Sequence, residues 1–169
     1  MKGLPYSRRR GSAILQPVTK IKKSFKETFT VTNAAPGYGT AVIAGLPQSN
    51  VLLLGLTMYL KLTKGGAGII DAFDGDYSLG TIPNANNALA DAEIDLLAST
   101  AFAAAAVGGV TGVMRSASAS SLAGTIFDNT DGSLEVNLNL LVDDASISAD
   151  ASMLAEGTLF MAYITLGDD

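Results

Sequence analysis

The sequence predicts an all-β protein: a jelly-roll-like β-sandwich with an extended N-terminal arm and one short helix. Segments in which apolar and polar residues alternate recur along the chain. Turn-forming Gly, Pro, Asn and Asp clusters separate them at intervals of about 8–12 residues, as in sandwiches. The longest stretch without a strand pattern lies mid-chain, where one long connection between two groups of strands is expected.

The chain length predicts one folded domain with an arm. A chain of 169 residues is large enough to fold without disulfides or metals. Residues 1–23 show little periodicity and contain Pro5 and Pro17, so we expect an extended arm that orders on binding. Residues 24–169 are expected to form the sandwich.

Strands are predicted first at 24–32 (SFKETFTVT), 40–45 (TAVIAG) and 51–63 (VLLLGLTMYLKLT). The third begins as a continuous apolar run and then alternates, which indicates a strand buried centrally at one end and half-exposed at the other. Its alternating part places Leu56, Met58, Leu60 and Leu62 inward and Thr57, Tyr59, Lys61 and Thr63 outward.

The middle of the chain predicts a hairpin and the short helix. Strands are expected on both sides of an Asp74–Gly75 turn within 69–82, because Asp-Gly is a common hairpin turn. Residues 84–100 (NANNALADAEIDLLAST) have apolar residues at roughly helical spacing, which predicts the helix. The Ala-, Gly- and Ser-rich stretch that follows has no firm assignment.

The last third returns to strand patterns. The segments LAGTIFD and SLEVNLNLLV flank NTDG, which predicts a second hairpin. Residues 143–157 are expected to form a long acidic loop, and 158–166 (TLFMAYITL) a final strand.

The composition excludes several kinds of catalytic and metal site. The chain has no cysteine and no histidine, which excludes disulfides, thiol nucleophiles and Ser-His or Cys-His pairs. The protein is therefore not expected to be an enzyme, and no cofactor, catalytic or metal site is assigned.

Asp71, Asp74 and Asp76 lack the spacing of a calcium loop and are expected to belong to a solvated turn. A solvated loop is likewise favoured for the acids at 143–156, because adjacent Asp residues on a strand end point to opposite faces.

No membrane association is expected. The longest strongly apolar run, at 51–60, is about half of the roughly 20 residues that a spanning helix needs. The basic N-terminus is not followed by the apolar stretch of a secretory signal.

Charge is strongly segregated along the chain. Residues 1–26 contain eight of the eleven basic residues and no acid, whereas 27–169 contain three basic residues and all sixteen carboxylates. These are charges of +8 and −13, which together give the net −5.

Apolar residues are interleaved with the cations of the arm, which favours a segment that lies along another protein over a tail that only keeps the chain in solution. Nucleic-acid arms tend to be denser in Lys and Arg, so a protein partner is preferred. The residues assigned to this partner-binding arm are Lys2, Leu4, Tyr6, Arg8, Arg9, Arg10, Ile14, Leu15, Lys20, Lys22 and Lys23.

The basic arm, the strand at 24–32 and the segments 51–84 and 123–168 together resemble the small jelly-roll decoration (cement) proteins of tailed phage capsids. The similarity lies in the texture and order of the segments over roughly residues 24–168. It implies a homotrimer on the exterior of the virion, whose arms run over neighbouring major capsid proteins and lock them together.

Two alternatives from other classes remain open. One is a viral coat or head-associated protein whose basic arm binds nucleic acid, and its affinity would fall steeply with salt. The other is a glycoside hydrolase that uses carboxylates alone, which requires a cleft with two converging acids.

Overall fold

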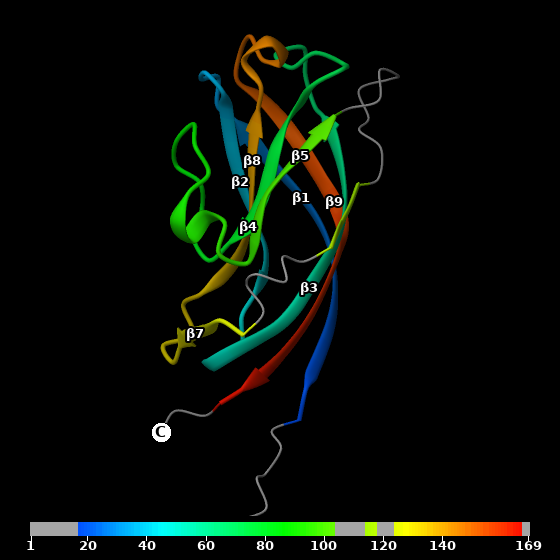
Figure 1. Ribbon diagram of the computed structural model, residues 1–169. Coiled ribbons are helices and arrows are strands. Elements are labelled where there is room, and N and C mark those ends of the chain that lie inside the picture. Colours follow the sequence, from blue (N-terminus) through cyan, green and yellow to red (C-terminus); the bar gives the residue numbers. More distant parts are fainter. Residues whose placement is uncertain (1–16, 104–113, 118–123, 167–169) are drawn as a thin grey trace, which may run out of the picture.

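The computed structural model describes residues 17–103, 114–117 and 124–166, which form two antiparallel β-sheets (Figure 1). Sheet A has five strands: β1 (Thr19–Val31), β9 (Ala151–Thr165), β3 (Ser49–Lys64) and β6 (Met114–Ala117) in that order, with β7 (Ile126–Asn129) also paired to β3. Sheet B has four strands in the order β2 (Gly37–Gly45), β8 (Glu135–Val142), β4 (Asp74–Gly80) and β5 (Leu97–Ala103).

The strand pairs are nested, which confirms the predicted jelly-roll class. β1 pairs with β9, β2 with β8, β3 with β6 and β7, and β4 with β5. This nesting is that of one long hairpin folded into two sheets, in which β9–β3 and β8–β4 pairing joins the strand pairs within each sheet.

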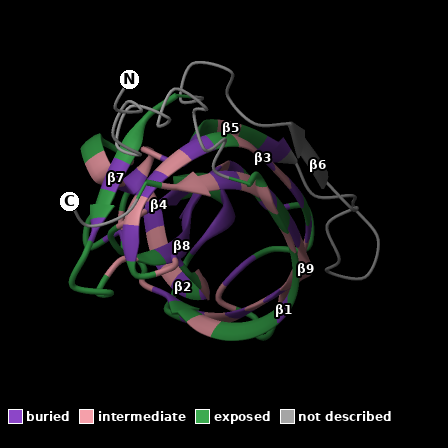
Figure 2. Ribbon diagram, turned by 90° about the horizontal axis from the view of Figure 1, so that it is seen from below, coloured by how far each residue is buried: buried purple, intermediate pink, exposed green. Residues whose placement is uncertain are grey.

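The core lies between the two sheets. Along β3 and β9, buried residues alternate with more exposed ones, and Figure 2 shows the buried positions as purple segments of the ribbon. The largest fully buried side chains are those of Tyr77, Phe73, Leu53, Met58, Leu60, Leu62, Ile69, Leu79, Leu96, Leu97, Leu138 and Leu140. The apolar rows predicted for β3 thus supply much of the core. No helix in the described part of the chain is both long and apolar enough to cross a membrane.

β2 and β3 extend the predicted strands by a few residues, whereas β1 and β9 extend them by five or more at their first residues. β1 begins at Thr19, so the last five residues of the predicted arm, 19–23, pair with residues 159–163 of β9. β9 begins at Ala151, and the predicted acidic loop 143–157 is therefore wrong beyond residue 150. The small buried residues Ala151 and Ala155 carry too weak an alternation signal to mark a strand in the sequence.

Neither predicted hairpin forms. Asp74 and Gly75 are ladder residues of β4, since Asp74 pairs with Ala103 and Gly75 with Val142. The NTDG turn does exist, with Gly132 at φ 74°, but β7 joins β3 in sheet A and β8 joins sheet B. This turn therefore carries the chain from one sheet to the other, which local turn chemistry cannot reveal.

The helix predicted over 84–100 is also wrong. The segment contains a single 3₁₀ turn, η2 (Asp91–Glu93), and then enters β5 at Leu97. Asparagine side chains compete for the backbone here, because Asn84 Oδ1 accepts from Asn86 N at 2.9 Å and Asn86 Oδ1 accepts from Ala88 N at 2.8 Å.

Candidate protein-interaction surface

The predicted arm is divided by the boundary of the described structure. Lys2, Leu4, Tyr6, Arg8, Arg9, Arg10, Ile14 and Leu15 lie outside the described residues. Lys20, Lys22 and Lys23 lie in β1, which is the edge strand of sheet A. Lysines on an edge strand also discourage unwanted strand addition, so their presence has a structural reason besides partner binding.

The pleat of β1 separates the three lysines. Lys20 and Lys22 share the outer face of sheet A with Lys26, whereas Lys23 lies on the same side of the strand as the buried Phe25. Lys22 Nζ lies 5.7 Å from the centroid of the Phe160 ring, a cation–π distance. The sequence grouped the three together, but only Lys20 and Lys22 contribute to one surface.

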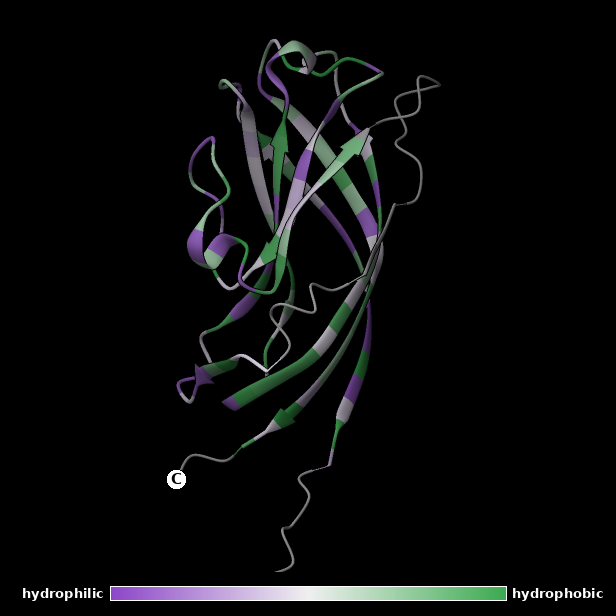
Figure 3. Cartoon of the chain, in the orientation of Figure 1, coloured by the Kyte–Doolittle hydropathy of each residue, from purple (hydrophilic) through white to green (hydrophobic). Residues whose placement is uncertain are grey.

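The strand register places the outward side chains in rows across β1, β9 and β3. One row contains Lys20, Ala162 and Gly55, and the next contains Lys22, Phe160 and Thr57. Two rows further along the strands, Lys26, Glu156 and Lys61 form a third. Figure 3 shows the hydrophilic positions of lower β1 beside the more hydrophobic β9 and β3. We call this surface the outer face of sheet A.

This face is positively charged although the chain as a whole is acidic. Among the described outward positions of β1, β9 and β3 there are four lysines and one carboxylate, Glu156. Glu156 contacts Lys26 Nζ at 2.8 Å and Lys61 Nζ at 3.7 Å. The hydrogen bond from Lys26, and the two lysine charges, hold the pKa of Glu156 below its usual value.

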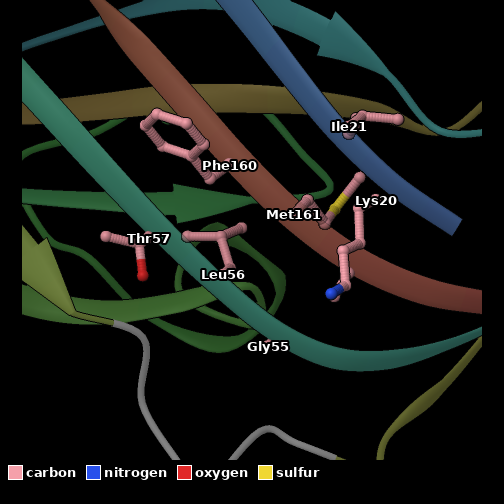
Figure 4. Close-up of a pocket in the computed structure, with 8 residues that line it drawn as sticks. Lys20, Ile21, Gly55, Leu56, Thr57, Phe160 and Met161 are labelled. Atoms are coloured by element: carbon pink, nitrogen blue, oxygen red, sulfur yellow. The ribbon is translucent and has the colours of Figure 1, made fainter. Parts of the chain in front are cut away.

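Exposed apolar side chains accompany these charges. Tyr59 and Phe160 are each more than a third exposed, and their rings meet edge to face with centroids 6.1 Å apart. Beside Phe160, a β-bulge between Leu53 and Gly55 opens an apolar hollow of about 310 Å³. Figure 4 shows this hollow, with the Lys20 side chain extending from β1 across β9 toward β3.

Of this surface, the sequence assigns only Lys20 and Lys22 to partner binding. The outward row of β3 was recognised, including Tyr59 and Lys61, but the side on which Phe160 projects follows only from the register of β9. The hollow depends on the bulge at Gly55, which leaves no signal in the hydropathy pattern.

The end of the sandwich that lies away from Lys20 is acidic. Asp74, Asp76, Asp143 and Asp144 lie near one another in the loops and strand ends there. Although Asp143 is an exposed residue, desolvation of its carboxyl group, followed by repulsion from the other three carboxylates, raises its pKa.

Other acids of this end have structural partners. Lys64 Nζ contacts Asp71 at 2.5 Å, and Asp150 accepts from Asn33 N at 2.6 Å. In the described ranges, no three acids are grouped so that they could hold a metal ion.

Comparisons with known proteins include a weak structural likeness to a viral structure. No family model matches the chain, and no curated protein matches it. A solved structure described as that of infectious bursal disease virus, Gx strain, is similar with a TM-score of 0.37 and 14% identity. The match covers 90% of this chain but 33% of the other, so the chain spans about a third of that protein's length.

Proposed function

We propose that the protein is a structural virion protein: a capsid decoration or cement protein that binds the outside of a phage head and stabilises contacts between major capsid proteins. The observation that carries this proposal is the continuity of the basic arm with β1. Arg8–Arg10 precede a strand whose Lys20 and Lys22 continue the positive charge onto the outer face of sheet A.

Segregated charge suits a clamp. A cationic arm is steered toward an acidic protein surface, and its interleaved apolar residues then hold it there. In a trimer, three linked arms would multiply modest single contacts by roughly 10²–10⁴. In this proposal the jelly-roll body supplies a rigid support for the arm.

Deleting residues 1–16 tests the proposal while leaving β1 intact. Binding is measured by co-sedimentation with heads that lack the protein, taken from the virus that encodes it. We expect the deletion to weaken binding at least about tenfold. The matched control replaces Leu4, Tyr6, Ile14 and Leu15 with Ser and retains every charge, so it isolates the apolar contribution. Unchanged binding by the deletion variant would reject the arm as the clamp.

The Arg8–Arg10 triplet favours one competing function, a head-associated protein whose arm binds nucleic acid. That function predicts measurable affinity for duplex DNA, with log K falling against log salt at about −0.9 per phosphate neutralised. The cement function predicts head binding that nuclease treatment does not change.

A further inference from the structure

We propose that the outer face of sheet A is a docking site for an extended acidic segment of a protein, which places one apolar side chain in the hollow between Phe160 and Lys20. This site is additional to the arm, and it does not depend on the partner being a capsid protein. It rests on three features of the described residues: the shape of the hollow, the line of cations beside it and the position of Lys22 over the Phe160 ring.

The hollow has the shape and polarity for an apolar side chain. Its floor is formed where Gly55 and Ala162 lie opposite each other on β3 and β9, and their small size leaves the space open. Phe160 supplies an apolar wall on the outer face, and the remaining lining residues are Lys20, Ile21, Thr57 and the inward-facing Leu56 and Met161. A volume of about 310 Å³ accommodates a large aliphatic or aromatic side chain.

The cations beside the hollow indicate an acidic and extended partner. Lys20, Lys22 and Lys26 project on one side of β1, and residues two apart in a strand are separated by about 6.7 Å. An extended segment running along β1 with acids at alternate positions would match Lys20 and Lys22. Lys26 already pairs with Glu156, whereas within the described residues no carboxylate is an ion-pair partner of Lys20 or Lys22.

The aromatic rings argue against single-stranded nucleic acid as the occupant. Stacking of a base needs an accessible ring face, but Lys22 Nζ lies over the Phe160 ring. Apart from Lys20 and Thr57, the side chains that line the hollow offer no hydrogen-bonding groups with which to read a base.

Filling the hollow tests the proposal directly. A Cβ built at Gly55 meets nothing within 4 Å, so Gly55→Leu is expected to fold and to occupy the hollow. Gly45→Leu is the matched control, because Gly45 also has open space and lies in sheet B. Thermal unfolding of both variants establishes that each is folded.

The probes are four defined molecules, titrated by calorimetry into the full chain. The first is a twelve-residue peptide that alternates Asp or Glu with Leu or Phe. The second has Lys in place of the acids, the third has Ser in place of the apolar residues, and the fourth is a single-stranded oligonucleotide of equal charge.

We expect the first peptide to bind, and the other three probes to bind at least about tenfold more weakly. Gly55→Leu and the double variant Lys20→Ser with Lys22→Ser should each reduce binding of the first peptide by a similar factor, while Gly45→Leu leaves it unchanged. Absence of binding by the first peptide, equal binding of another probe, or indifference to Gly55→Leu would overturn the proposal. Because no viral heads are used, failure here is separate from failure of the cement function.

Discussion

Asn139 is a buried side chain whose hydrogen-bonding capacity is fully used. Its Oδ1 accepts from Thr40 Oγ1 and Asn84 N, both at 2.8 Å. Its Nδ2 donates to the carbonyl oxygens of Ile82 at 3.0 Å and Glu93 at 2.9 Å. One amide therefore attaches the connection between β4 and β5 to sheet B, which explains why this segment follows an irregular path instead of forming a helix.

Replacing Asn139 should be costly. Asn139→Leu leaves four polar groups without this partner, and each unsatisfied buried group costs about 1–3 kcal/mol, so we expect the free energy of unfolding to fall by at least about 3 kcal/mol. Asn137→Leu is the control, because the Oδ1 of this equally buried side chain has no hydrogen-bond partner among the described residues. Urea denaturation measures the free energy of unfolding of both variants. Similar losses in the two variants would contradict the role assigned to Asn139.

The raised pKa of Asp143 makes the acidic end sensitive to pH. Because the folded protein holds this proton more tightly than the unfolded chain, the ionised carboxylate destabilises the fold above its folded pKa. Stability is regained as the pH falls through the raised pKa toward the usual value of 3.8. Asp143→Asn should therefore raise Tm at pH 7 by less than about 4 °C and have little effect near pH 4. Thermal melts of both proteins between pH 4 and pH 7 check this prediction. A Tm of the variant at pH 7 that is unchanged or lower would refute it.

Among the elements, β9 organises sheet A because it pairs with β1 on one side and β3 on the other. Gly157 lies at its centre, opposite both Phe25 and Leu60. A Cβ at this position would lie 2.0 Å from the carbonyl oxygen of Tyr59 and 2.7 Å from the Phe25 ring. The close passage of β3 over β9 therefore requires glycine.

A methyl group at Gly157 should separate these strands. We expect Gly157→Ala to lower the free energy of unfolding by about 2 kcal/mol or more, because the neighbouring carbonyl belongs to the backbone and cannot move aside freely. Gly55→Ala, at an open position two strands' width from β1, should change it by no more than about 0.5 kcal/mol. Chemical denaturation measures the free energy of unfolding of both variants. A Gly157→Ala variant as stable as the original protein would show that β9 can shift.

At the scale of the whole molecule, charge and topology act together. The described chain begins and ends at one end of the sandwich, since Thr19 pairs with Tyr163, and the acidic loops lie at the other (Figure 1). Thr19, the first residue of β1, therefore lies at the end of the sandwich away from these acids.

The trimer implied by the family resemblance is tested on the intact protein. Native mass spectrometry at moderate ionic strength should show three copies of 17.3 kDa, about 52 kDa in total. A species at 17.3 kDa alone would reject the homotrimer. The arm deletion is measured alongside, to show whether assembly needs residues 1–16.

The sequence by itself determined the fold class, the positions of most strands and the separation of charge between arm and body. Each of these follows from local patterns: period-two alternation, turn residues and the order of charged residues. The inward row of β3 was correct for the same reason, because alternation along one strand depends only on neighbouring positions.

Only the tertiary structure decided which strands pair and which side chains share a face. β7 and β8 are joined by an ordinary turn yet belong to different sheets, and the segment at 84–100 is held by Asn139 from far along the chain. The outer face of sheet A likewise exists because register brings Lys20, Phe160 and Gly55 together from three strands. Such contacts join residues far apart in the sequence, from 46 positions between Asn139 and Glu93 to 142 between Lys20 and Ala162, and their free energy has no counterpart in any local stretch of sequence.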